Sequence, residues 1–568
     1  MKYKAVSPVK KSKDRKGSFN FTVLLIICGI VLFTGLLYRN SLKGEFLSYD
    51  DTDNVVNNPL IQQLSLETLP RFFFTSNLYM YTPVTFISYA FDYKMNGLNP
   101  FYFKLTNLLL HLVNIILVYL FSMQILRKQN PAILLALLFA IHPVNVDSIS
   151  WISSRSNLLS ALFLLLTLIL YLIYLQKNKT AFLLLSMISF VLSLLSKSSG
   201  VMLPFTLFFI DFLQKRKFTY RLILEKIPYL IISLLVGLLT IYFRTDSGNT
   251  QSMAEYTLSD HILMICFSIM VYLFRAIFPV HLSEVYAYPV KSDGFMPFWY
   301  YLAPIVIVCA GFAIYRLKTL KRELVFGICF FLINIILTQV ILLEDGFMAS
   351  RYAYLPYIGL YFIMVKVYDF YTIRSYKVKM FLSSSVLLLL LVFAFLSYER
   401  SMVWTNTLTL FDHVIRQSPD AAFAYNNRGI AKYTGNDLDG ALADYDQAIK
   451  LNPKYAGAFY NRGIVFYAVR EYEKARIDYT KAIELNSRFA SSYAARGILE
   501  MDVLKNDSLA LKDYNKAIGI NPAFGLAYYN RGILELRMND VSNACKDFWK
   551  VKNLGYAKAD DLISHYCN

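Results

Sequence analysis

Long apolar runs separated by short polar stretches dominate the first 396 residues. A membrane-spanning helix needs about 17–25 mainly apolar residues, and most of these runs have that length, although 131–141 and 200–213 are short. The pattern predicts an all-α polytopic membrane domain over residues 19–396, preceded by a basic tail over residues 1–18. The twelve candidate runs are 19–38, 103–126, 131–141, 157–175, 180–196, 200–213, 226–243, 260–279, 298–315, 324–343, 354–370 and 379–396.

Lys and Arg clusters in the connecting loops predict the topology, because cytoplasmic loops collect these residues. Neighbouring clusters must enclose an even number of crossings, yet three runs lie between 215–221 and 316–322. We expect 260–279 not to cross fully, since Arg275 and Pro279 interrupt its end. Eleven crossings from a cytoplasmic N-terminus place the C-terminal region outside, in the periplasm of a bacterium or the endoplasmic reticulum lumen of a eukaryote. The clusters lie at the N-terminus, 127–128, 177–179, 215–221, 316–322 and 374–379.

The pattern changes after residue 396, where we expect a linker helix over 397–418 and sequence repeats over 419–568. An Arg-Gly pair recurs at steps of 34, 34 and 35 residues, which is the tetratricopeptide period. About four helical hairpins would form an α-solenoid of the kind that binds peptides or proteins. The repeated arginines leave capping or inter-repeat hydrogen bonds and ligand binding both open, and one inserted residue near Lys505-Asn506 is expected in a turn. The pairs end at Gly429, Gly463, Gly497 and Gly532.

Composition agrees with a membrane protein. The chain is 56% hydrophobic and 17% charged, and its mean hydropathy is +0.42, which excludes a purely soluble enzyme and a disordered chain. The formal charge of +18 comes from the membrane half, because residues 397–568 hold 22 Lys and Arg against 20 Asp and Glu. Nucleic-acid binding is therefore not expected. Cys545 and Cys567 are equally compatible with a disulfide in an oxidising compartment and with free thiols.

The first outside loop carries three carboxylates within four positions, Asp50, Asp51 and Asp53. Adjacent carboxylates repel, which raises the pKa of one and suits it to proton abstraction or to holding a cation. A solvated turn rich in Asp, Asn and Pro is the alternative interpretation.

Further ionisable residues lie where the apolar runs meet the outside. His142, Asp147 and Arg155 follow one run and are expected to pair with each other or with an anionic ligand, because such groups are costly at a membrane boundary. Arg351 lies directly before a span, where a guanidinium can bind phosphate bidentately, and Lys197 lies at another outside break. Together these features describe an enzyme acting on a phosphate-bearing lipid. For His111 and Asn114, within an apolar run, we favour interhelical hydrogen bonding over chemistry.

The motifs in this order resemble the transmembrane and tetratricopeptide-repeat O-mannosyltransferases, a family of C-type glycosyltransferases. The resemblance covers nearly the whole chain. It departs from the family pattern at Ser154-Arg155-Ser156-Asn157, where Gly-Arg-Ala followed by an acid is expected, and at Ser198, where a glutamate is expected after Lys197. The motifs are Tyr49-Asp50-Asp51 with Asn57-Asn58-Pro59, Tyr81-Thr82-Pro83-Val84, Leu105-Thr106-Asn107-Leu108-Leu109-Leu110-His111, Ile141-His142-Pro143-Val144 and Ser350-Arg351-Tyr352-Ala353-Tyr354-Leu355-Pro356.

This resemblance implies inverting transfer of a sugar from a polyprenyl-phosphate carrier to a protein hydroxyl. It implies a general base at Asp50 or Asp51 and cations that stabilise the leaving lipid phosphate. The small size suggests a bacterial-type relative, so the sugar need not be mannose. The implied phosphate-binding residues are Arg351, Lys197 and Arg155, and the implied supporting residues are His142, Asp147, Tyr352 and Asp53.

Two other functions fit the sequence. A lipid-linked oligosaccharide ligase or polymerase has a similar layout, but it would not obviously need the adjacent aspartates. A membrane-anchored tetratricopeptide scaffold without catalysis would dispense with Asp50 and Asp51 but not with the repeats. The sequence leaves the sugar, the carrier, the acceptor, the oligomeric state and any divalent-metal requirement open.

Overall fold

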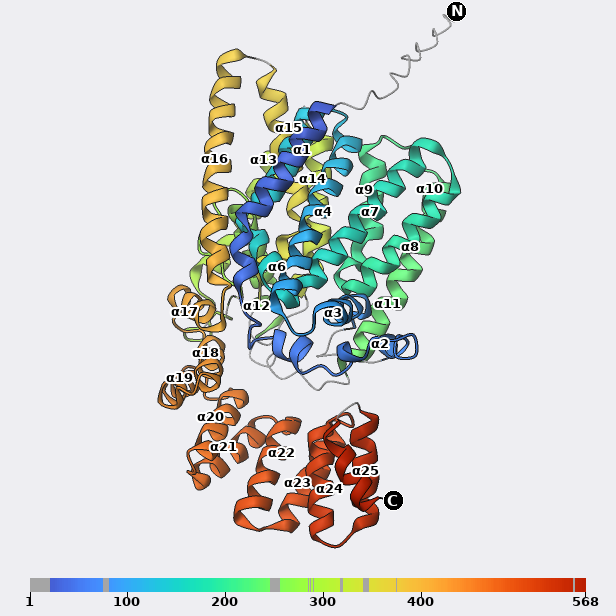
Figure 1. Ribbon diagram of the computed structural model, residues 1–568. Helices are drawn as coiled ribbons and strands as arrows, with labels where there is room; N and C mark the ends of the chain where they lie inside the picture. Colours follow the sequence, from blue (N-terminus) through green and yellow to red (C-terminus); the bar gives the residue numbers. More distant parts are fainter. Residues whose placement is uncertain are drawn as a thin grey trace, which may run out of the picture.

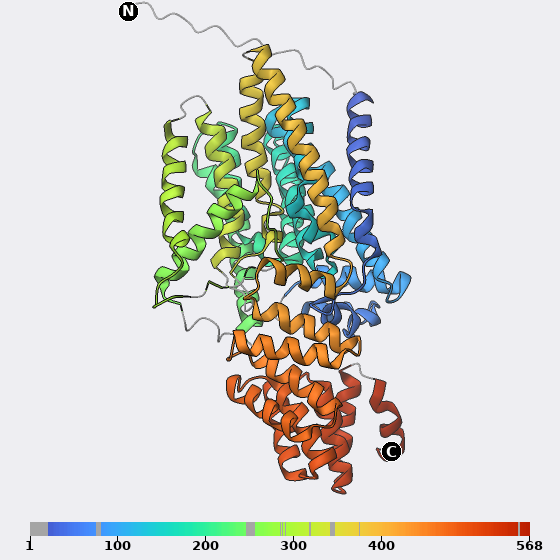
Figure 2. The ribbon, with the colours of Figure 1, turned by 90° about the vertical axis from the view of Figure 1, so that its left-hand side faces the viewer.

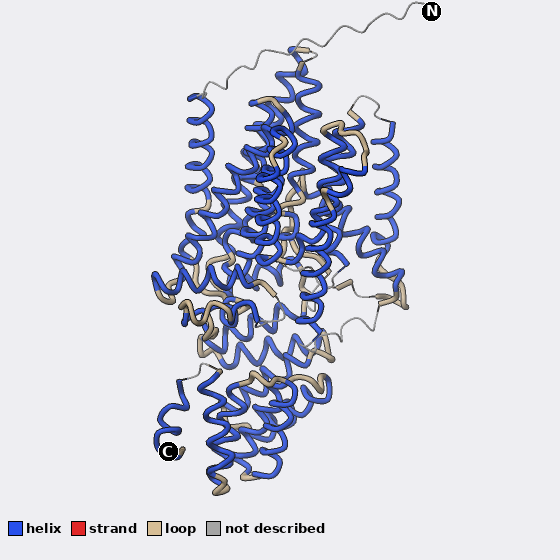
Figure 3. Tube along the Cα trace, turned by 90° about the vertical axis from the view of Figure 1, so that its right-hand side faces the viewer, coloured by secondary structure: helices blue, strands red, loops and turns tan. Residues whose placement is uncertain are grey.

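The computed structural model describes residues 21–74, 81–245, 256–284, 286, 288–289, 291–316, 320–340, 347–373, 375–554 and 557–567. Over these ranges the chain is helical, and β-pairing is limited to the isolated bridges Tyr286–Met348 and Ser292–Phe295. Figure 3 shows a helical bundle with a smaller stack of helices at one end. The basic tail, residues 1–18, lies outside the described residues.

Apolar helices lie side by side in the bundle (Figure 1). Six of the described helices are long and apolar enough to cross a membrane, and the pair Gln129–Ile141 and Pro143–Ser150, bent by 51°, would make seven. One of the six is α12 (Leu258–Arg275), which lies in the run expected not to cross. The eleven crossings and their orientation stay predictions. The other five are Pro100–Leu126, Ile152–Lys177, Tyr220–Phe243, Lys321–Gln339 and Tyr376–Val403.

The bundle contains shorter helices as well as the long ones. Its elements are α1 (Phe21–Leu37), η1 (Arg39–Lys43), η2 (Thr52–Val56), η3 (Ile61–Gln63), α2 (Arg71–Phe74), α3 (Pro83–Asn96), α4 (Pro100–Leu126), α5 (Gln129–Ile141), η4 (Pro143–Asn145), α6 (Val146–Ser150), η5 (Ile152–Ser154), α7 (Arg155–Lys177), α8 (Thr180–Ser196), η6 (Ser198–Met202), α9 (Leu203–Leu213), α10 (Tyr220–Leu224), α11 (Ile227–Thr245), α12, α13 (Phe298–Arg316), α14 (Lys321–Val340), η8 (Ser350–Ala353), α15 (Tyr357–Thr372) and α16 (Tyr376–Val403).

Buried polar residues of α4 bind neighbouring elements. The Nδ1 atom of His111 lies 2.8 Å from the hydroxyl of Tyr354, and Asn114 donates to the same hydroxyl at 3.1 Å. Asn114 also donates to the carbonyl of Leu158 in α7 at 3.0 Å. The Nε2 atom of His111 lies 3.1 Å from the carbonyl of Ala140 in α5, so interhelical hydrogen bonding by His111 and Asn114 is confirmed.

The C-terminal part stacks antiparallel helix pairs below the bundle (Figure 2). Close helix contact explains the periodic glycines, because a Cβ atom on Gly429 would lie 2.6 Å from the ring of Tyr445. The helices are α17 (Thr407–Gln417), α18 (Ala422–Thr434), α19 (Leu438–Leu451), α20 (Ala456–Ala468), α21 (Tyr472–Leu485), α22 (Ala490–Leu499), α23 (Asp507–Ile520), α24 (Gly525–Arg537), α25 (Val541–Asn553) and α26 (Asp560–Tyr566), with η9 (Glu500–Leu504) and η10 (Ala557–Ala559).

The repeated arginines connect successive repeats. Arg462 donates through Nε and Nη2 to Asp478 at 2.8 Å, and through Nη1 to Asp446, one repeat earlier, at 2.6 Å. Equivalent contacts occur at each repeat, so inter-repeat hydrogen bonding explains these arginines. The other sets are Arg428 with Asp444 and Asp412, Arg496 with Asp513 and Thr480, and Arg531 with Asp547 and Asn515.

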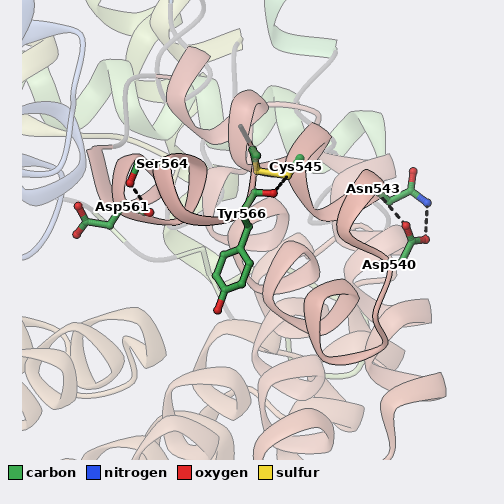
Figure 4. The surroundings of a disulfide bond; sticks show 7 residues. Asp540, Asn543, Cys545, Asp561, Ser564 and Tyr566 are labelled. Carbon is green, nitrogen blue, oxygen red and sulfur yellow. Dashed lines mark hydrogen bonds between the residues drawn. A yellow bond between two sulfur atoms is a disulfide. The ribbon is translucent and has the colours of Figure 1, made fainter.

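The inserted residue of the third repeat lengthens the end of α22 into a π-helical turn, η9, and Lys505 closes it with a φ of 55°. At the end of the array, a disulfide joins Cys545 of α25 to Cys567, just after α26 (Figure 4). Of the two states that the sequence left open for these cysteines, the structure contains the disulfide.

Only residues 404–406 separate α16 from α17, and they are bound to the bundle. The carbonyl of Thr405 accepts from the backbone N–H of Glu45 at 2.8 Å. The Thr407 hydroxyl accepts from the backbone N–H of Ser48 at 3.0 Å. The loop that carries the paired aspartates is thus hydrogen-bonded to the start of the repeats.

Candidate functional site

The paired aspartates follow α1 and occupy different environments. Asp51 is fully buried, and one of its oxygens accepts from the N–H of Ser153 at 2.9 Å and from its hydroxyl at 2.6 Å. The other oxygen accepts from the N–H of Leu47 at 3.1 Å. Burial raises the pKa of the Asp51 carboxyl, and the hydrogen bonds from Ser153 oppose this rise. Asp51 therefore anchors its loop to η5, whereas Asp50 is half-buried.

Lys197 and Arg351 line one pocket of about 440 Å³, a volume that includes space open to solvent. The ammonium of Lys197 donates to Asn157 Oδ1 at 2.5 Å and lies 5.3 Å from the ring centroid of Tyr352. The guanidinium of Arg351 lies 5.2 Å from the same centroid. Asn157 stands where the family pattern has an acid, so Lys197 meets a neutral partner there, and burial together with Arg351 lowers the pKa of Lys197 to about 7. The arrangement suits an anion such as phosphate.

Arg351 also connects the pocket with the aspartate loop. Its carbon Cζ lies 4.8 Å from the ring centroid of Trp151, and that ring lies 5.5 Å from the ring of Tyr49. The charge of Asp50 acts on Arg351. Behind the pocket, Arg351 donates to the carbonyl of Glu284 at 2.9 Å and lies 3.7 Å from its carboxylate.

Arg155 lies away from this pocket. Its guanidinium is fully buried, 2.6 Å from the carboxylate of Asp92, and it donates to Asn107 Oδ1 and to the carbonyl of Phe103, both at 2.8 Å. It also lies 4.6 Å from the ring centroid of Tyr89. These partners hold α3, α4 and α7 together, so Arg155 is not grouped with Lys197 and Arg351.

Asp147 and His142 are buried against α16 and do not line the pocket of Lys197 and Arg351. Asp147 forms a bidentate pair with Arg400 of α16, with N···O distances of 2.7 and 2.9 Å. His142 packs among aromatic rings, including Phe393 of the same helix at 4.5 Å between centroids, and its Nδ1 accepts from the N–H of Val144. Both residues position α16 rather than line the pocket.

The remaining predicted residues differ in exposure. Asp53 lies exposed on η2, whereas Tyr352 is half-buried in the pocket wall. Within the ranges that the structure describes, no three His, Cys, Asp or Glu side chains come together as a metal site would require.

The sequence did not identify three residues that bind the predicted site residues. Asn157 binds Lys197, Glu284 binds Arg351 and Arg400 binds Asp147. The departure from the family pattern at Asn157 was a usable signal. Arg400, 253 residues from Asp147, carried no local signal.

Comparison with known proteins supports a glycosyltransferase domain and repeats. Residues 82–243 match the family of dolichyl-phosphate-mannose-protein mannosyltransferases, which confirms an enzyme-family domain in this membrane protein. Residues 431–469 match a TPR repeat and residues 456–489 a tetratricopeptide repeat.

The relatives include members of the family that the motifs resemble. Protein O-mannosyl-transferase F38B6.6 of Caenorhabditis elegans is 25% identical over 437 residues, which is 74% of this chain and 61% of that protein. Protein O-mannosyl-transferase TMTC1 of Mus musculus is 33% identical over 146 residues, or 24% of this chain and 15% of that protein. The chain thus spans less than two thirds of each of these relatives, and they are distant homologues that confirm the predicted resemblance.

Among solved structures, YrrB, described as a TPR protein with an unusual peptide-binding site, matches 25% of this chain and 74% of its own at 24% identity, with a TM-score of 0.23.

Proposed function

We propose that the protein is a membrane glycosyltransferase that moves a sugar from a polyprenyl-phosphate donor to a protein hydroxyl. The observation that carries this proposal is the pocket with Lys197 and Arg351, which aromatic contacts join to the loop of Asp50. The names of the matched family and relatives make dolichyl-phosphate mannose and a serine or threonine acceptor the first substrates to test.

In the proposed reaction, the acceptor oxygen attacks the anomeric carbon and the bond from that carbon to the lipid phosphate breaks. Asp50 takes the hydroxyl proton, and the phosphate leaves with the bonding electrons. Lys197 and Arg351 then stabilise the charge that develops on the phosphate. Asp51 is fully buried, where an acceptor hydroxyl cannot reach it, and it binds Ser153 and Leu47, so we assign it the role of holding the loop.

We further propose that the site and the repeats face the same extracytoplasmic or luminal compartment. The aspartate loop and the repeats lie at the same end of the bundle (Figure 1). The loop-charge pattern supports this orientation, and so does the Cys545–Cys567 disulfide, since such bonds persist in oxidising compartments. The repeats would bind the acceptor protein near the site.

The test compares Asp50→Asn with Glu67→Gln, which changes an exposed carboxylate elsewhere between α1 and α3. Cells carrying each variant at matched expression are analysed by glycopeptide mass spectrometry, and purified protein is assayed for transfer from dolichyl-phosphate mannose to a serine- and threonine-containing peptide library. Loss of a general base should lower transfer by about 10²–10⁴-fold in Asp50→Asn only.

Lys197→Met and Arg351→Met should each lower transfer per folded molecule, because they remove charges from the leaving-group side. Arg351→Met also leaves the buried Glu284 carboxylate without its cation, so the folded yield of each variant is measured alongside the rate. If Asp50→Asn keeps the native glycopeptides and rate, the proposed mechanism is wrong. If no variant changes any glycopeptide while deletion of the repeats still changes the cell envelope, the scaffold function is correct instead.

A further inference from the structure

A second pocket lies at the ends of α4, α7, α9 and α10, at the end of the bundle away from the repeats (Figure 1). Its volume is about 900 Å³, including space open to solvent, and Arg127, Arg216 and Arg221 line it. No residue of the candidate catalytic site contributes to this lining.

The floor of this pocket is balanced in charge. Arg216 donates to Asp211 at 3.0 Å and to Glu225 at 2.8 Å, and the buried Lys226 pairs with Asp211. Both carboxylates are almost fully buried, so the two cations stabilise two anions that would otherwise be costly. Tyr174 donates a further hydrogen bond to Glu225 at 2.7 Å.

The rim, in contrast, carries excess positive charge. Arg127 donates to the amide oxygen of Gln214 at 3.1 Å, and Arg221 donates to that of Asn178 at 3.4 Å. Amide oxygens orient a guanidinium without cancelling its charge. Arg221 also lies 3.6 Å from Glu225, but Arg216 already pairs with that carboxylate. Two oriented guanidiniums thus line a concave site whose floor is neutral.

Exposed aromatic and aliphatic side chains lie beside this rim. Phe218 is 79% exposed, Tyr220 is 78% exposed and Leu224 is 47% exposed, although they belong to a polar loop and a helix end. Aromatic side chains next to basic ones at the end of an apolar helix are typical of the level of the lipid headgroups. The pocket therefore opens where phosphate groups of the bilayer are found.

We propose that this pocket binds the phosphate of an anionic bilayer phospholipid through Arg127 and Arg221. A phosphodiester has two non-bridging oxygens, which a guanidinium can bind bidentately. In this proposal the apolar side chains at the rim contact the acyl chains. This lipid site is independent of the proposed transferase reaction.

The test uses the full chain purified in detergent and titrated with phosphatidylglycerol or phosphatidylcholine, with bound lipid counted by native mass spectrometry. The variant Arg127→Gln, Arg221→Gln removes both rim charges. The control Lys179→Gln, Lys217→Gln removes the same charge from exposed positions that do not line the pocket. The melting temperature of each protein is measured in the same detergent without lipid, which reports folding separately.

We expect the native chain and the control to retain phosphatidylglycerol over phosphatidylcholine, and the rim variant to bind phosphatidylglycerol at least tenfold more weakly at an unchanged melting temperature. Equal loss in control and rim variant would overturn the proposal, because the attraction would then be a general effect of basic loops. Displacement of the lipid by millimolar inorganic phosphate would overturn the lipid as the source of the phosphate group. If the rim variant alone melts early, Arg127→Lys, Arg221→Lys must keep the charge preference, and its failure to do so also overturns the proposal.

Discussion

Removal of the arginine from one repeat should open that repeat selectively. In Arg462→Met, the carboxylate of Asp478, whose side chain is 4% exposed, loses its bidentate partner. The second partner of Arg462, Asp446, is 62% exposed and will simply become hydrated. Loss of the contact with Asp478 should therefore destabilise the repeat, whereas loss of the contact with Asp446 should have little effect.

The magnitude follows from these burials. Breaking a buried pair by removing one partner costs about 3–5 kcal/mol, and the lower end applies because the Arg462 side chain is 21% exposed. About 3 kcal/mol raises the opening equilibrium of α20 and α21 by more than a hundredfold. Asp446→Asn breaks only a solvent-exposed pair, which is worth about 0–1 kcal/mol.

Hydrogen exchange followed by mass spectrometry on the full chain measures both effects, since repeat arrays open locally. Peptides from α20 and α21 should lose protection in Arg462→Met and keep it in Asp446→Asn. Adding Asp478→Leu to Arg462→Met should restore most of the protection, because an apolar side chain removes the stranded charge. Equal and small losses in the two single variants would refute the idea that this pair supports the repeat.

Three further predictions concern other parts of the chain. Burial raises the pKa of Glu535 from 4.5 to about 7, so between these pH values the folded repeat keeps a proton that the unfolded chain has lost. Stability should therefore fall as the pH rises from about 4.5 to 7. Glu535→Gln should flatten the dependence of the melting temperature on pH. Reduction of the disulfide, which encloses a separation of 22 residues, should cost about 3 kcal/mol, and Cys545→Ser should melt at the same temperature with and without reductant. Thr407→Val removes the acceptor of two hydrogen bonds from Ser48, at about 1 kcal/mol each, so exchange of the Ser48 amide should accelerate about thirtyfold.

The fold was largely predictable because its signals are local. Apolar length predicts the membrane helices, and the 34-residue period predicts the repeats, since each hairpin packs on its neighbour in sequence. The sequence left the repeated arginines open between hydrogen bonding and ligand binding, and only the structure decides, because Arg462 joins residues 16 positions away on both sides. The position of the third-repeat insertion required the backbone, since η9 takes up the extra residue before the turn.

The candidate site was predictable only as a set of residue types. Sequence cannot distinguish Asp50 from Asp51, because what separates them is burial: Asp51 lies buried against Ser153 of η5, whereas Asp50 is half-buried. Arg155 and Arg351 both lie at the predicted outside ends of apolar runs, yet only Arg351 lines the pocket. Arg155 is instead held within the bundle by its ion pair with Asp92. Such differences arise from contacts between distant segments, which a single sequence does not report.

The three-residue connection between α16 and α17 limits how far the repeats can move relative to the bundle. A domain on a flexible tether of n residues samples a volume whose radius grows as about 5–6 Å × √n. Here Thr405 and Thr407 are hydrogen-bonded to the bundle, so the repeats stay close to one orientation. A polypeptide segment bound to the repeats is therefore held at a fixed distance from the bundle, which sets its effective concentration there. Only those of its residues that lie at the right distance from the binding point reach the membrane surface at this raised concentration.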